Sequence, residues 1–150
     1  MKIKFAVITL LLFAFCGPQT QAEICEEYWY VAEYEIELLE ENVEDLSNSF
    51  NLYDKNELSE GILYANIKEQ IVNLDNNIEN ISDLTPNEAN ELYHKRLLTN
   101  FEVMKDGLNS LEKWISDSGT LGDRFDAAIE YVEGLTEILE IKLEWTCPTD

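Results

Sequence analysis

The residues of this chain best suited to chemistry are Glu91 and the single histidine, His94, three positions later. A glutamate and a histidine at this spacing share one face of a helix, and such pairs bind metal in di-iron carboxylate bundles. That centre needs a second pair and two further glutamates, whereas the sequence contains no second histidine. His94 also precedes Leu97 by three residues, which places it near an apolar helix face. We therefore interpret His94 as a structural or exposed residue, with Glu91 and His94 as a minor alternative for metal binding.

Other kinds of catalytic site find little support in the sequence. A serine triad would need His94 as its base, yet no serine lies in a Gly-x-Ser-x-Gly nucleophile elbow. The six glycines form no phosphate-binding loop, and no Cys-x-x-Cys-His segment is present for covalent haem. Carboxylate pairs are abundant, but a narrow helical bundle has no cleft in which to desolvate them. We expect neither an enzyme nor a cofactor.

Composition and charge restrict the partners. The chain has 150 residues, the size of one domain, and its 45% hydrophobic content predicts a packed core. Acidic residues number 31 and basic residues 10, which gives a formal net charge of −21. Nucleic acid is excluded as a partner because its phosphates would be repelled, and an anionic membrane surface is excluded for the same reason.

The N-terminus has the pattern of a secretory signal peptide. Lys2 and Lys4 precede an apolar run of 12 residues, Phe5–Cys16, and a small-residue cleavage site ends at Ala22. The run is too short to span a bilayer, which needs about 20 residues. We expect a signal peptide at residues 1–22 and a secreted or periplasmic protein that is not inserted in a membrane after cleavage.

The remaining segment, residues 23–150, is expected to be one helical-bundle domain. Loss of the two N-terminal lysines leaves 8 basic residues against 31 acidic ones, a formal net charge of −23. Two cysteines remain, Cys25 and Cys147, near opposite ends of this domain. Because an exported protein meets an oxidising compartment, we expect these two cysteines to form an intramolecular disulfide.

Apolar residues recur every three or four positions almost throughout the domain, and no segment alternates with period two. The predicted helices are 24–51, 56–82, 86–116 and 121–146. Capping residues support three starts: Asp54 with Glu57, the Thr85-Pro86-Asn87-Glu88 segment, and Thr120 with Asp123. The sequence therefore predicts an all-α, up-down-up-down four-helix bundle with its termini joined by the disulfide.

Each predicted helix has an apolar seam that we expect to face the core. The first seam is Cys25, Trp29, Ala32, Ile36, Leu39, Val43, Leu46 and Phe50, and the second is Tyr64, Ile67, Ile71, Leu74, Ile78 and Ile81. The third is Leu97, Phe101, Met104, Leu108, Leu111 and Ile115. The fourth is Leu121, Phe125, Ala128, Val132, Leu135 and Leu139, with a second core line of Tyr131, Ile138 and Trp145 beside it.

The outer face of the first helix is the candidate binding surface. It carries two tyrosines and a leucine spaced four apart, flanked by carboxylates: Tyr30, Tyr34, Leu38, Glu37, Glu41 and Asp45. Tyrosine is enriched at protein interfaces because it buries a large area with few rotatable bonds. This surface suits a partner with an apolar ridge bordered by lysine or arginine. A homodimer contact or scattered surface residues are the alternatives.

Taken together, these features predict an exported acidic binding protein that engages a basic protein, in an inhibitor or immunity-like role. The alternatives are a cation- or small-ligand-binding bundle and a structural envelope or extracellular component. Under these alternatives, the carboxylates on the surface of the protein would keep it soluble or bind cations loosely. Asn80-Ile81-Ser82 matches a glycosylation sequon, but Ile81 also completes an apolar seam, so we interpret the match as chance.

Overall fold

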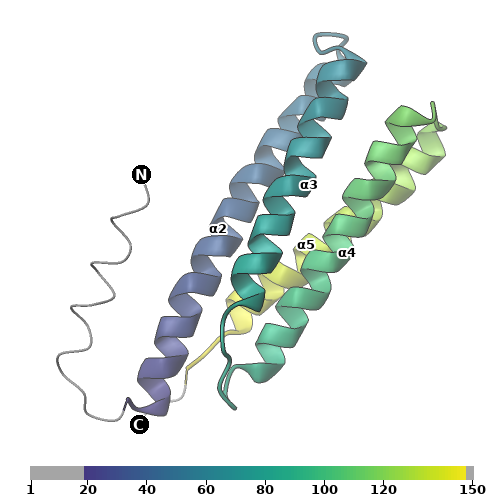
Figure 1. Cartoon of the computed structure of the whole chain (residues 1–150). Helices are drawn as coiled ribbons and strands as arrows, with labels where there is room; N and C mark the ends of the chain where they lie inside the picture. The colour runs from purple at the N-terminus through teal and green to yellow at the C-terminus, as the bar shows by residue number, and fades with distance from the viewer. Residues whose placement is uncertain (1–18, 148–150) are drawn as a thin grey trace.

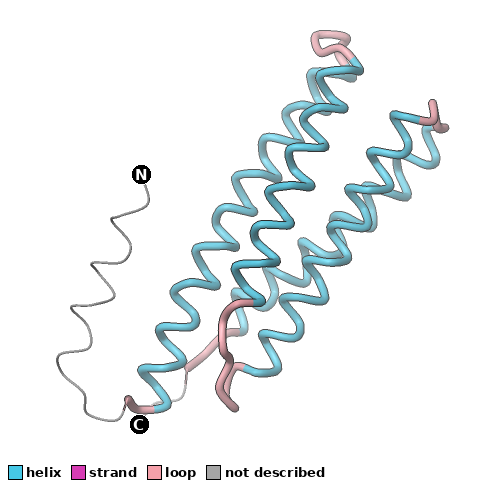
Figure 2. Tube along the Cα trace, in the orientation of Figure 1, coloured by secondary structure: helices cyan, strands magenta, loops and turns pink. Residues whose placement is uncertain are grey.

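The computed structural model describes residues 19–147, which form a bundle of helices (Figure 1). The helices are α2 (Gln21–Asp54), α3 (Glu60–Ser82), α4 (Glu91–Ser116) and α5 (Leu121–Glu144). Short loops join them, so consecutive helices run antiparallel, and this part of the chain contains no strand (Figure 2). The predicted up-down-up-down four-helix bundle is confirmed.

The signal-peptide prediction falls largely on residues 1–18, which lie outside the described residues. Thr20 caps α2: its side chain accepts a hydrogen bond from the backbone N–H of Glu23, and the Glu23 carboxylate accepts one in return. Cleavage after Ala22 would remove this capping box. From residue 19 to residue 147, no helix combines the length and hydropathy needed to cross a bilayer.

The predicted start of α5 is confirmed, and the predicted start of α3 is wrong. Thr120 and Asp123 form a complete capping box at the first turn of α5. In contrast, Asp54 ends α2 and does not open α3, which begins at Glu60. The chain leaves α2 through Asn56, whose φ of 60° is left-handed and terminates the helix.

The predicted capping box before α4 is also wrong: Asn87 and Asn90 form a turn there, and Asn90, the N-cap residue, makes no side-chain cap hydrogen bond. The Asn90 side-chain oxygen accepts a hydrogen bond from the Asn87 N–H (2.7 Å), and the Asn87 side-chain oxygen accepts from the Asn90 N–H (3.1 Å). This reciprocal pair makes a tight turn over residues 87–90, so α4 begins at Glu91 and not at Pro86.

The first three predicted seams face the core. All six residues of the seam on α4 are buried, and the seams on α2 and α3 are buried or packed against the core. The fourth seam is wrong for Leu121, Phe125 and Val132, which are 53–61% exposed, whereas its members Leu135 and Leu139 do pack against the core. The second line of α5 is the buried one, and its members are Tyr131, Ile138 and Trp145, joined by Ala127, Gly134 and Ile141.

Two glycines explain why α5 turns this face inward. A Cβ atom at Gly134 would lie 2.7 Å from the backbone oxygen of Asn100, and one at Gly107 would lie 2.6 Å from the backbone nitrogen of Tyr131. The backbones of α4 and α5 therefore approach too closely for any side chain at these positions. The face of α5 that carries Gly134 fits against α4, so Leu121, Phe125 and Val132, on another face, point outward.

The α2–α3 interface is joined by polar side chains. Asn66 donates to Ser49, Asn73 to Asn42 and Asn77 to Glu35. Asn80, the sequon residue, also donates to the Glu35 carboxylate (3.1 Å). Burial raises the pKa of Glu35 despite the hydrogen bond from Asn80.

The disulfide joins the two ends of the described chain, as predicted. Cys25 and Cys147 are bonded across a sequence separation of 122 residues, with their Cα atoms 5.7 Å apart. Beside the disulfide, Trp145 stacks on Trp29 (4.5 Å between ring centroids) and on Tyr28 (5.4 Å), and it also contacts Tyr93 (4.6 Å). This aromatic cluster connects α2, α4 and the end of α5.

Replacing Gly107 by alanine should lower the free energy of unfolding by about 1–3 kcal/mol, because the added methyl would overlap the backbone of Tyr131. Gly61→Ala is the matched control, since a Cβ there meets nothing within 4 Å, and it should raise stability by up to about 1 kcal/mol. Urea titrations followed by circular dichroism measure both. Equal behaviour of the two variants would contradict the close approach of α4 and α5.

Loss of the disulfide should lower the free energy of unfolding by about 2–5 kcal/mol, because the bond closes a long loop. The test measures the free energy of unfolding in urea for the double variant Cys25→Ser/Cys147→Ser and for the oxidised protein. The oxidised protein should have the intact mass of a monomer lighter by two hydrogens and no reactive thiol. A covalent dimer would contradict the topology.

Candidate functional site

The outer face of α2, which carries the predicted binding residues, is exposed to solvent. Tyr30 and Tyr34 are 77% and 55% exposed, whereas Leu38 is half-buried. Glu37, Glu41 and Asp45 are exposed along the same face. The structure therefore brings the six predicted binding residues onto one side of a single helix, although Leu38 adds less free area than the tyrosines.

This face of α2 does not exchange side-chain hydrogen bonds or ion pairs with the rest of the described chain. The ion pairs that α2 makes lie on its flanks: Glu40 with Lys142 of α5 (3.2 Å), and Asp54 with Arg124 of α5 (2.6 Å). The Arg124 guanidinium is the main cause of the lowered pKa of Asp54. The carboxylates of the outer face thus have no such counter-charge.

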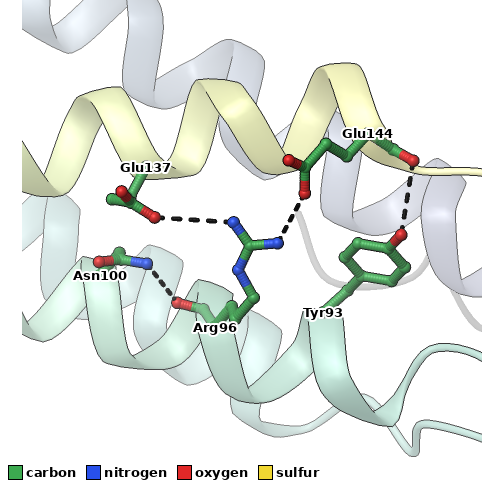
Figure 3. Close-up of polar contacts among 5 residues, drawn as sticks. All are labelled: Tyr93, Arg96, Asn100, Glu137 and Glu144. Carbon is green, nitrogen blue, oxygen red and sulfur yellow. Dashed lines mark hydrogen bonds and ion pairs between the residues drawn. The ribbon is translucent and has the colours of Figure 1, made fainter.

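Most of the basic residues pair with carboxylates of the protein itself. Six of the eight lysines and arginines in residues 23–147 form salt bridges: Lys68, Lys95, Arg96, Lys105, Arg124 and Lys142. Figure 3 shows one of these sites, where Arg96 of α4 reaches Glu144 (2.7 Å) and Glu137 (3.6 Å) of α5. In the same view, the Tyr93 hydroxyl donates to the backbone oxygen of Glu144, and Asn100 donates to that of Arg96. Because five of these six cations pair with a carboxylate of another helix, most of the carboxylates on the outward faces have no basic partner in the described part of the chain.

The candidate metal ligands Glu91 and His94 have separate partners. The Glu91 carboxylate pairs with Lys95 one turn later (2.6 Å), and hydrogen bonding to that lysine lowers the pKa of Glu91. His94 instead places Nδ1 2.8 Å from the hydroxyl of Tyr28. Within residues 19–147, no three histidine, cysteine, aspartate or glutamate side chains gather in a geometry that would hold a metal ion.

His94 belongs to the aromatic cluster beside the disulfide. Its ring meets Tyr28 edge-on (5.8 Å between centroids), and Tyr28 in turn stacks on Trp145. Burial lowers the pKa of His94, and the charge of Lys95 lowers it further. Burial also raises the pKa of Tyr28, so the phenol stays protonated and is hydrogen-bonded to Nδ1 of the His94 ring. This arrangement holds α4 against α2.

A second exposed surface lies on α5, and the sequence does not predict it. Phe125, Ile129 and Val132 are 59%, 55% and 53% exposed, and they border a groove of about 710 Å³ between α4 and α5. Phe125 and Val132 were expected in the core. The signal that locates them outside is the small-residue spacing of Ala127 and Gly134, which marks the face that fits against α4.

Comparisons with protein-family models, with curated proteins and with solved structures found no match to this chain.

Between about pH 7.5 and 5.5, His94 should make the free energy of unfolding fall as the pH falls. Its folded pKa lies below the ordinary value of about 6.5, so the unfolded chain takes up the proton first. His94→Gln, which keeps a hydrogen-bond acceptor for Tyr28, should flatten this slope. Urea titrations at several pH values measure it, and identical slopes in both proteins would contradict the shifted pKa.

Proposed function

We propose that this protein is an exported acidic binding module that engages a basic protein through the outer face of α2. The observation that carries the proposal is the exposure of Tyr30 (77%) and Tyr34 (55%) among carboxylates that pair with no basic residue of residues 19–147. Aromatic rings supply apolar contact area, and the surrounding charges attract and orient a cationic surface. A role as an inhibitor of, or immunity protein against, a basic exported protein fits this description.

The charge favours a hetero-partner over a second copy of the chain. Residues 23–150 have a formal net charge of −23, so two copies repel each other at long range. The same field raises the rate of encounter with a cationic protein by about 10- to 1000-fold at low salt. A disulfide between Cys25 and Cys147 is consistent with the oxidising compartment in which such an encounter would take place.

Tyr30→Ala combined with Tyr34→Ala should weaken binding of the partner at least tenfold without lowering stability, because both side chains lie largely in solvent. The oxidised protein serves as bait for exported proteins of the source organism at about 50 mM and about 500 mM salt. A captured basic protein is then purified and titrated against both proteins by calorimetry.

Val72→Ala is the matched control for this experiment, since Val72 is 58% exposed on α3. Binding should be unchanged in the control and weaker at high salt in the parent protein. The proposal fails if no basic protein is captured at low salt. It also fails if the tyrosine variant binds as tightly as the control, or if the parent protein instead forms a dimer that the tyrosine variant lacks.

A further inference from the structure

The outer side of α5 presents a continuous apolar line to solvent. Phe125, Ile129 and Val132 follow one another at steps of four and three residues, and Leu121 (61% exposed) extends the line by one turn. From Leu121 to Val132 the line is about 17 Å long at 1.5 Å per residue. Monomeric proteins rarely expose apolar side chains in such a contiguous row, so the row indicates an interaction surface.

This row lies beside a groove rather than on a ridge. Val103 and Asn100 of α4 form one wall, and Ile129, Val132 and Thr136 of α5 form the other, around a volume of about 710 Å³. The apolar side chains on α5 remain more than half exposed, whereas a small ligand needs a pocket that buries most of its surface. The groove therefore suits a macromolecular segment better than a small molecule.

Carboxylates continue the groove toward the α4–α5 loop. A second hollow of about 600 Å³ shares Ile129 and Glu133 with the first. Its lining includes five carboxylates and one lysine: Asp117, Asp123, Asp126, Glu130, Glu133 and Lys113. An occupant of both hollows thus meets apolar side chains at one end and an excess of negative charge at the other.

We propose that this groove between α4 and α5 is a docking site for a cationic amphipathic helix of the basic partner. The proposal rests on the proposed function for the nature of the partner, but it uses a different helix and different residues from the α2 face. The apolar side of the docked helix would cover Phe125, Ile129 and Val132, and its lysines or arginines would lie against Asp126, Glu130 and Glu133.

Two physical arguments select this occupant. A second copy of the chain would bring an equal negative charge to an already acidic rim, whereas a cationic segment complements it. An extended peptide would leave its backbone groups without partners, because residues 19–147 contain no strand edge. A helix satisfies its own backbone hydrogen bonds and packs into a groove through apolar residues spaced three and four apart.

The test uses a synthetic helix of about 18 residues, built from leucine and lysine with leucines on one face, a length of about 27 Å. Binding to the oxidised protein is measured by calorimetry at about 50 mM salt and again at about 500 mM. Phe125→Ser combined with Ile129→Ser should weaken binding at least tenfold. Glu133→Lys, an exposed single change, should weaken it by a smaller factor and reduce its salt dependence. Val72→Ala, an exposed change on α3 outside both proposed surfaces, should leave it unchanged.

Control peptides separate shape from charge. A peptide of the same composition with leucines spread around the helix, and one with glutamate in place of lysine, should both bind at least tenfold more weakly. The inference is overturned if the parent protein does not bind the cationic helix, or if the Phe125 and Ile129 changes and Glu133→Lys leave binding intact. It is also overturned if the Phe125 and Ile129 changes leave peptide binding intact but abolish self-association of the protein or its binding to phosphatidylcholine vesicles.

These outcomes are distinct from a failure of the proposed function. Peptide binding that is lost only in the Tyr30 and Tyr34 variant would reject the α5 groove and support the α2 face. Capture of a basic protein that is unaffected by the tyrosine changes, but lost with Phe125→Ser and Ile129→Ser, would reject the α2 face and support the groove.

Discussion

The close approach of two helix backbones at Gly107 and Gly134 decides how the rest of this bundle is arranged. With no Cβ atom at either position, α5 lies directly against α4, and its contacts with the other helices are sparser. The face of α5 that carries Gly134 must then point inward, together with Tyr131 and Ile138. As a result, Phe125 and Val132 point outward, which gives the protein an apolar surface that a looser bundle would have buried.

The contact between α5 and α2 depends on different interactions, located mainly near the two ends of α5. At one end, Arg124 pairs with Asp54 and lies over the rings of Phe50 (4.8 Å) and Trp114 (5.4 Å). At the other end, the disulfide and the stacking of Trp145 on Trp29 join the C-terminal segment to α2. The buried face of α5 is therefore set by these contacts and by the glycines, and not by the number of apolar residues on each face.

The sequence predicts most of this fold because one apolar seam dominates each of the first three helices. Residues such as Ile36, Ile67 and Phe101 are buried as their spacing requires. The prediction fails for the first half of α5, where two apolar lines compete and hydrophobic spacing alone favours the longer line. It also fails at Asn56, whose left-handed backbone follows the end of α2, and at Asn87, whose side chain forms a turn before α4; a search for capping boxes detects neither. At the candidate site, Tyr30 and Tyr34 lie on the outer face as predicted, whereas the groove on α5 follows from the misassigned seam.

The distribution of charge connects the packing to the proposed binding surfaces. Cations such as Arg96, Arg124 and Lys142 bridge neighbouring helices, where each neutralises carboxylates that would otherwise repel one another. This use of the few basic residues leaves the outward faces of α2 and α5 with carboxylates beside exposed apolar side chains. Water and salt screen those carboxylates in the free protein, but a cationic partner would supply the missing counter-charge and cover the apolar groups together. Because most of the few basic residues pair within the bundle, its outward faces keep the carboxylates that the proposed basic partner would neutralise.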